Sequence, residues 1–150
     1  MSPPGRRSAR RQAVFVLYQL DLLDISALAA LARGTHTELD AYSRRLVIGV
    51  AENRQEIDDR LVPHLANWSL ERLGVLERSI LRLAVYELLW EKDVPAAVAI
   101  NEAVTLARKF CSDEAGALVN GVLGSLQTSE GTRHEGPQTG GDVGEYSSDG

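Results

Sequence analysis

The sequence predicts an all-α fold, a compact bundle of about six or seven helices. Apolar residues recur with a spacing near 3.6 in every periodic segment, and no long alternating β-branched run indicates a strand. The single Asn-Gly pair, Asn120-Gly121, lies within a segment of helical spacing. With 150 residues and 44% hydrophobic content, the chain is expected to bury the core of one domain.

The first two helices are predicted by their ends. The first is expected to begin around residues 2–4, where proline is tolerated in an initial turn, and to run to about Leu23. Asp24 is then expected to cap a second helix, which Gly34 ends because glycine favours the position after a helix.

The middle of the chain predicts a long helix and then a central one. The long helix begins after Thr35 or Thr37 and ends near Pro63, which enforces a break within about a turn. Residues 73–90 form the most apolar segment, and a helix that is apolar on most sides is expected to be buried. Its main stripe holds Leu73, Leu76, Ile80, Leu83 and Ala84.

Two further helices are predicted after residues 92–95. Apolar residues from Ile100 to Cys111 share one face of the first, and the second follows Ser112 and Asp113. Cys111 has no neighbouring base in the sequence, so we interpret it as a core thiol rather than a reactive one.

Composition divides the chain into two parts. Residues 1–126 are expected to form the helical domain. Residues 127–150 are expected to form a disordered, acidic, glycine-rich tail, because they hold almost nothing apolar to offset the entropy of ordering.

Several classes of protein are disfavoured by what the sequence lacks. It has no apolar run long enough to span a bilayer and no secretory signal pattern, and its single cysteine excludes an internal disulfide, so we expect a cytoplasmic protein. It has no phosphate-binding loop, nucleophile elbow or metal-ligand spacing. We therefore expect no enzyme activity, no cofactor and no metal.

Charge is distributed unevenly. The net charge is −5, yet residues 1–11 hold four arginines and no acid. On a helix these arginines fall within an arc of about 140° and repel one another at the positive end of the helix dipole. A patch of this kind is a common footprint of nucleic-acid binding, although it is also compatible with a solvated helix end. The four residues are Arg6, Arg7, Arg10 and Arg11.

An apolar group continues the arginine side of the first helix. Val14, Tyr18 and Leu22, with Phe15 beside them, lie outside the stripe expected to pack on the core. The same side of the helix therefore changes from cationic to apolar along its length, which is typical of a shared binding surface. A symmetric homodimer through the apolar group is an alternative that the sequence leaves open.

Three stretches resemble the NusB family of bacterial transcription antitermination factors. They are RRSARRQAVFVLYQLDL, ERLGVLERSILRLAVYELL, and DVPAAVAINEAVTLARKF followed by LVNGVL. The resemblance covers about residues 5–126. It implies two small helical subdomains and a non-enzymatic role, in which the protein binds boxA RNA of ribosomal RNA leader transcripts together with NusE and helps RNA polymerase resist termination.

The resemblance also implies roles for particular residues. The four arginines match the family's RNA-contacting start, Tyr18 matches a tyrosine that faces NusE, and Glu71 and Glu77 match acids near that surface. Val14 and Leu22 extend the expected NusE surface. Lys109 is expected to meet phosphate. Asn120 suits a base edge or, as we favour, a structural role, and Gly121 is expected to permit close helix packing. Leu118 stands where an aromatic is common in the family, which weakens the expected RNA contact there.

Two other functions remain open at this stage. Similar helical domains precede the catalytic domain of ribosomal RNA cytosine methyltransferases, but this sequence contains neither a Gly-rich cofactor loop nor the motif of a cysteine nucleophile. A helical module that binds only proteins, with incidental arginines, is the other alternative. Binding of labelled RNA distinguishes this last alternative from an RNA-binding antitermination factor.

Overall fold

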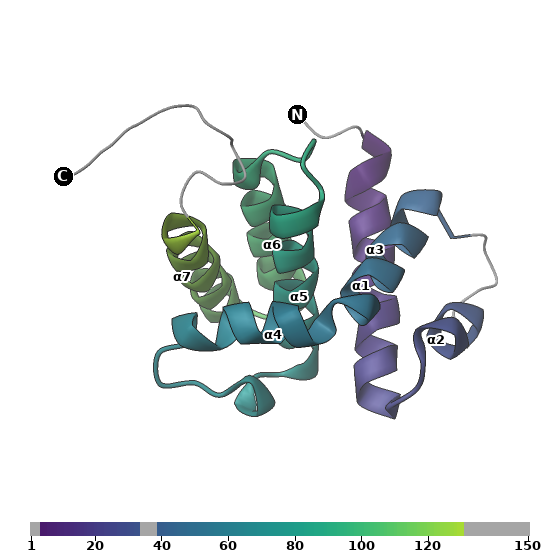
Figure 1. Cartoon of the computed structure of the whole chain (residues 1–150), viewed down its shortest axis with the longest axis horizontal. Coiled ribbons are helices and arrows are strands. Elements are labelled where there is room, and N and C mark those ends of the chain that lie inside the picture. The colour runs from purple at the N-terminus through teal and green to yellow at the C-terminus, as the bar shows by residue number, and fades with distance from the viewer. Residues whose placement is uncertain (1–3, 34–38, 131–150) are drawn as a thin grey trace.

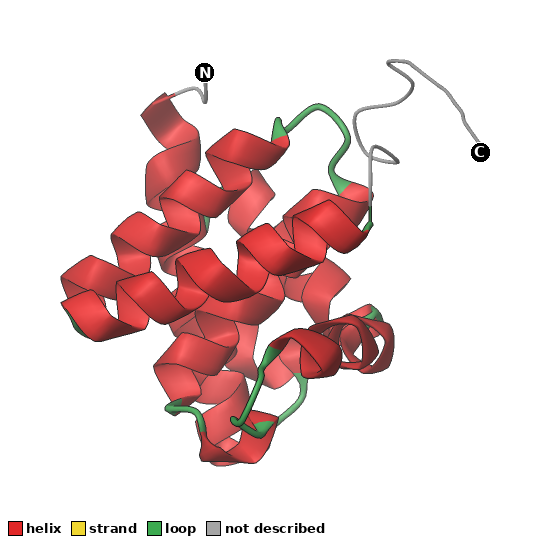
Figure 2. Ribbon diagram, turned by 90° about the vertical axis from the view of Figure 1, so that its left-hand side faces the viewer, coloured by secondary structure: helices red, strands yellow, loops and turns green. Residues whose placement is uncertain are grey.

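The computed structural model describes residues 4–33 and 39–130, and all its regular elements are helical (Figures 1 and 2). The all-α prediction is therefore confirmed, and the described residues contain no strand. These two ranges contain seven α-helices, and two 3-10 helices lie between the fourth and fifth. The α-helices are α1 (Pro4–Leu23), α2 (Ala27–Arg33), α3 (Ala41–Glu52), α4 (Arg54–Leu61), α5 (Val75–Trp90), α6 (Ala96–Phe110) and α7 (Asp113–Ser129); the 3-10 helices are η1 (Val62–His64) and η2 (Leu70–Arg72).

Two helix ends differ from the prediction. Asp24 does not cap α2, because its backbone adopts a left-handed φ of 54° and Ser26 Oγ accepts the Ala29 N–H instead, at 3.1 Å. The long helix expected up to Pro63 is divided at Asn53, whose side-chain Nδ2 donates to the Gly49 carbonyl at 2.8 Å. Helix α3 begins at Ala41 with Asp40 as its N-cap, while Gly34, Thr35 and Thr37 lie outside the described residues.

Helix α5 is the centre of the molecule, as its apolar sequence predicts. Every residue from Ser79 to Leu88 is buried. On one side α5 packs against α1 and α3, and on the other against α6 and α7, which also pack on each other (Figure 1). This arrangement matches the two helical subdomains that were expected.

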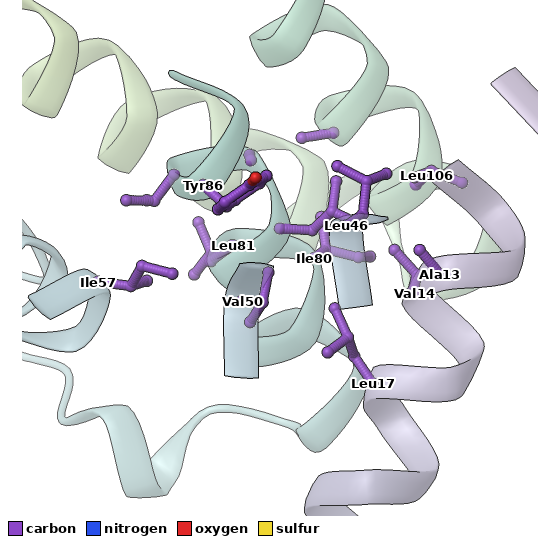
Figure 3. Packing of buried hydrophobic residues seen from close by; sticks show 14 of the residues in the cluster. Ala13, Val14, Leu17, Leu46, Val50, Ile57, Ile80, Leu81, Tyr86 and Leu106 are labelled. Atoms are coloured by element: carbon purple, nitrogen blue, oxygen red, sulfur yellow. The ribbon is translucent and has the colours of Figure 1, made fainter. Parts of the chain in front are cut away.

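Helix α1 is enclosed on more sides than its sequence suggests. Ala13, Val14 and Leu17 point toward the core side chains of α3 and α5 (Figure 3). Val14 is fully buried, so its assignment to an exposed partner surface is wrong. The reason is that α3 and α5 both pack on α1 and cover the side on which Val14 lies.

The C-terminal boundary lies slightly beyond the predicted one. Helix α7 continues to Ser129, and Glu130 Oε2 pairs with Arg60 Nη1 at 2.9 Å. Residues 131–150, which make up most of the predicted tail, lie outside the described residues.

No single helix in residues 4–33 or 39–130 is long and apolar enough to cross a membrane. The pair α1 and α2 meets the length and composition test together, but the two helices are bent by 118°.

Candidate nucleic-acid interface

The four N-terminal arginines do not share one surface. The Arg6 guanidinium lies over the Tyr42 ring, 4.1 Å from its centroid. Arg7 is 74% exposed in its side chain and pairs with Glu102 of α6, with Nη2 2.8 Å from Oε2. Arg11 is exposed. These three arginines therefore supply the surface charge of this helix end.

The prediction that Arg10 belongs to an exposed basic face is wrong, because this residue is only 1% exposed. Its Nε donates to both carboxylate oxygens of Glu87 at 2.9 Å, and the Tyr42 hydroxyl donates to Glu87 Oε2 at 2.5 Å. Glu87 stands in the apolar part of α5, and a buried acid of this kind requires a cation or hydrogen-bond donors. An acid within the apolar segment of α5 was therefore the signal in the sequence that a basic residue such as Arg10 would be buried beside it.

The buried network fixes α1 on its neighbours. Burial raises the pKa of Glu87 against the opposing effect of Arg10. Burial and the negative charge of Glu87 also raise the pKa of Tyr42, so its hydroxyl remains a donor. Because the network joins α1, α3 and α5, it sets the positions from which Arg6, Arg7 and Arg11 project.

A groove next to Arg11 combines cations with aromatic rings. It has a volume of about 510 Å³ and is open to solvent. Phe15 of α1 and Phe110 of α6 meet edge to face in its wall, with ring centroids 5.0 Å apart. Lys109 Nζ lies 5.5 Å from the Phe110 centroid. We call this space the α1/α6 groove; its lining is Arg11, Gln12, Phe15, Val16, Gln19, Leu39, Lys109 and Phe110.

Sequence reasoning missed Phe110 and did not place Phe15 in an RNA site. The two lie 95 residues apart in the chain, so no local pattern relates them. Phe110 follows Lys109 directly at the end of an amphipathic helix, and this pairing of a cation with an aromatic was the available signal. Glu102, which holds Arg7, was also missed.

The predicted α7 residues lie outside the groove. Leu118 is half-buried against the core. Asn120 is exposed, and its side chain makes no hydrogen bond within the described part of the chain, so the structural role favoured for it is wrong. A Cβ built on Gly121 would meet nothing within 4 Å, which likewise contradicts the close packing expected there.

The other expected partner residues lie on adjoining elements. Tyr18 is half-buried, and Leu22, one turn further along α1, is 53% exposed. Arg78 connects this end of α1 to η2, since Nε donates to Asp21 at 2.8 Å and Nη1 to the Leu70 carbonyl at 3.0 Å. Glu71 is exposed on η2.

Glu77 has a structural contact of its own. Its Oε1 accepts the Gly74 N–H at 3.0 Å and so caps α5. This contact does not test the expected role of Glu77 in binding NusE, which stays a prediction.

Two side features bear on chemistry. Cys111 is half-buried against the core at the end of α6, and burial raises the pKa of its thiol. No group of three histidine, cysteine or acidic residues within the described ranges is placed to hold a metal ion.

The fold and the groove together define a class, an all-helical protein with a cationic and aromatic surface suited to a nucleic-acid strand. A family model described as the NusB family matches residues 7–128. The transcription antitermination protein NusB of Bacillus velezensis is 43% identical over 124 residues, which cover 82% of this chain and 95% of that protein. This chain therefore belongs to the NusB family.

Solved structures agree with this assignment. A structure of T. maritima NusB has a TM-score of 0.75 and 37% identity, covering 84% of this chain and 92% of that one. A chain in the crystal structure of antitermination factors NusB and NusE in complex with dsRNA has a TM-score of 0.72 and 32% identity, covering 83% of this chain and 96% of that one.

Proposed function

We propose that this protein is a cytoplasmic transcription antitermination factor that binds boxA RNA of ribosomal RNA leader transcripts together with NusE. In this role it would help RNA polymerase resist termination. The observation that carries the proposal is the α1/α6 groove, in which Arg11 and Lys109 flank the Phe15 and Phe110 rings. The names of the relatives and the solved complex with NusE and dsRNA support it.

The groove suits a strand with accessible bases. Cations that contact phosphate add affinity without reading sequence, whereas selection requires bases that stack on side chains or are read at their edges. Phe15 and Phe110 offer ring surface for stacking, and Gln12 and Gln19 belong to the same lining. Gln12 Oε1 already accepts the Ser43 hydroxyl at 2.9 Å and Gln19 Oε1 is buried, so the amide N–H groups of these side chains are what remains to contact a base. Arg6 and Arg7 extend the positive surface toward the helix start, while the buried Arg10 acts only through the fold.

RNA binding can be tested by titrating labelled boxA RNA and a scrambled RNA at two salt concentrations. We expect Phe110→Leu to weaken boxA binding by about fivefold to a hundredfold, because stacking on an aromatic contributes about 1–3 kcal/mol per base. Lys109→Ala should also make the slope of log affinity against log salt shallower, by about 0.7 for each single-strand phosphate that the lysine neutralises.

Lys92→Ala is the matched control, because Lys92 is an exposed lysine in the loop between α5 and α6. It should leave both affinities unchanged. If boxA and scrambled RNA bind alike, or if neither binds, the RNA-selective function is wrong and a protein-binding module becomes the better account.

The NusE surface is proposed at the C-terminal end of α1 and at η2. Tyr18 and Leu22 offer apolar contact, and Glu71 offers negative charge that would orient a basic ribosomal protein and speed its association. We expect Leu22→Asp to weaken NusE binding without changing the affinity for RNA alone. Leu28→Asp is the matched control, since Leu28 is 75% exposed on α2. Equal losses in both variants would contradict this location.

A homodimer through the same surface would compete with NusE. With Val14 buried and Phe15 in the wall of the α1/α6 groove, Tyr18 and Leu22 remain of the apolar group expected to pair, and so small a patch favours a monomer. Sedimentation of the free protein at tens of micromolar, the order at which modest interfaces form, should give a monomer. A dimer that Leu22→Asp dissociates would contradict this expectation.

A further inference from the structure

A second surface hollow lies beside α3 and adjoins the α1/α6 groove. It has a volume of about 640 Å³ and is open to solvent. Leu39 lines both spaces, so the two form neighbouring parts of one surface. We call the second space the α3 hollow; its wall includes Leu39, Arg44, Arg45, Ile48, Gly49 and Tyr86.

The α3 hollow is positively charged where it approaches the groove. Arg44 is exposed and has no ion-pair partner among residues 4–33 and 39–130. Arg45 is 62% exposed in its side chain, while its Nε is held 2.8 Å from Oε2 of the buried Glu91. Glu52, the acidic member of the lining, lies two turns further along α3 than the two arginines.

The hollow is built to contact a backbone rather than to stack a base. The Tyr86 ring is closed on one face by Trp90, stacked with centroids 5.7 Å apart, and it also packs against Gly49, where a Cβ would lie 2.4 Å from the ring. The Tyr86 hydroxyl donates to Glu91 at 2.9 Å. A ligand in the hollow therefore meets arginine head groups and aliphatic side chains. Such groups can contact phosphate and ribose, and they do not distinguish one base from another.

We propose that an RNA strand bound in the α1/α6 groove continues past Leu39 into the α3 hollow, where Arg44 and Arg45 contact phosphates of nucleotides that flank the specific element. This inference rests on the proposed function and extends it to a second contact surface. Arg44 is the freely placed cation, and Arg45 is a cation anchored by Glu91. The contact adds affinity for longer RNA and does not discriminate sequence.

The experiment compares a core boxA RNA with the same RNA carrying a short flank of mixed sequence at either end. The flanked RNA should bind about fivefold more tightly to the unaltered protein, which is the upper end of what one exposed ionic contact contributes. Arg44→Ala should remove this gain and lower the salt dependence for flanked RNA by about 0.7. Its affinity for core RNA should be unchanged.

Three further variants make the outcome decisive. Arg72→Ala is the matched control, because Arg72 is an exposed arginine at η2, before the start of α5, whereas Tyr86 and Glu91 lie at the other end of that helix. It should retain the gain. Arg45→Lys keeps the cation near Glu91 and should also retain it. Arg44→Glu should make the flank unfavourable.

Some results would overturn the inference while the proposed function stands. These are core binding with no gain from either flank, or an Arg44→Ala variant that loses affinity for core and flanked RNA equally. A protein that binds neither RNA overturns both proposals. Unchanged thermal unfolding of Arg44→Ala, expected for an exposed residue, ensures that a loss of binding is not a loss of fold.

Discussion

At the residue scale, two adjacent arginines have opposite functions. Arg10 lies beside Leu17 on the helical wheel, at the border of the stripe that packs on α3 and α5, and its guanidinium is sealed against Glu87. Arg11 is one position further around the helix and lines the α1/α6 groove. The two side chains leave the helix about 100° apart around its axis. Arg10 therefore stabilises the fold, whereas Arg11 is available to contact RNA.

This contrast gives a paired prediction. Arg10→Ala should lower the free energy of unfolding by about 3–5 kcal/mol, because it leaves the Glu87 carboxylate buried without its cation. Arg11→Ala should change that free energy by less than about 0.5 kcal/mol, as exposed substitutions do, and should weaken RNA binding instead. Urea unfolding and RNA titration of both variants test the pair. Similar stabilities for the two would contradict the structural role of Arg10.

At the element scale, the contact of α3 with α5 depends on a residue that has no side chain. Gly49 allows α3 to approach the Tyr86 ring, whose hydroxyl is fixed by Glu91 and whose face is stacked on Trp90. The ring therefore has little freedom to move aside. In the sequence, Gly49 stands inside a helical pattern and carries only the general signal of a close approach.

Gly49→Ala is expected to lower the free energy of unfolding by about 1–3 kcal/mol, the usual cost of overpacking. The added Cβ would lie 2.4 Å from Tyr86 ring atoms. Gly121→Ala in α7 serves as the matched control, because its Cβ meets open space and alanine is the better helix former, so it should stabilise by about 0.5–1 kcal/mol. A Gly49→Ala protein as stable as the control would show that the helix contact is looser than described.

At the scale of the whole molecule, an ionic cluster around Asp21 joins α1, α4 and α5. Arg78 Nε and Arg82 Nη1 lie 2.8 and 3.2 Å from Asp21 Oδ2, and Arg82 also pairs with Asp58 of α4 at 2.8 Å. Although burial acts in the opposite direction, the hydrogen bond from Arg78 and the neighbouring arginine charges lower the pKa of Asp21 below its ordinary value of 3.8. The stability that this ionic cluster contributes therefore depends on pH.

The direction of that dependence follows from the lowered pKa. Below about pH 5 the unfolded chain binds more protons at this position than the folded chain, so the stability from Asp21 is present above its ordinary pKa and is lost as pH falls through the folded value. We expect Asp21→Asn to flatten the acid side of the curve of unfolding free energy against pH.

Asp59→Asn is the control for the pH experiment, because Asp59 is an exposed acid of α4. The urea-unfolding free energy would be followed from about pH 3 to pH 7, the range in which carboxylates titrate. If Asp21→Asn and the unaltered protein lose stability in parallel as the pH falls, the ionic cluster does not carry the acid response.

The sequence alone determined the helices, because helical periodicity and end signals are local. Pro4, Pro95 and Ser112 stand where α1, α6 and α7 begin, and the apolar segment around Ile80 became the central helix. The NusB resemblance was likewise carried by contiguous residues. Local signals failed at two helix ends. At Asn53 the predicted long helix is divided, and both the backbone N–H and the side-chain Nδ2 of Asn53 donate to the Gly49 carbonyl. At the start of α2, Ser26 takes the capping role expected of Asp24.

Only the tertiary structure decided which residues of α1 became surface and which became core. Arg10 and Val14 were expected on an exposed face, but the packing of α3 and α5 on α1 buried both. The Phe15 and Phe110 pair and the shared wall at Leu39 exist because α6 and the start of α3 are brought to α1 by folding. Periodicity specifies the faces of one helix, whereas a binding surface depends on how several helices meet.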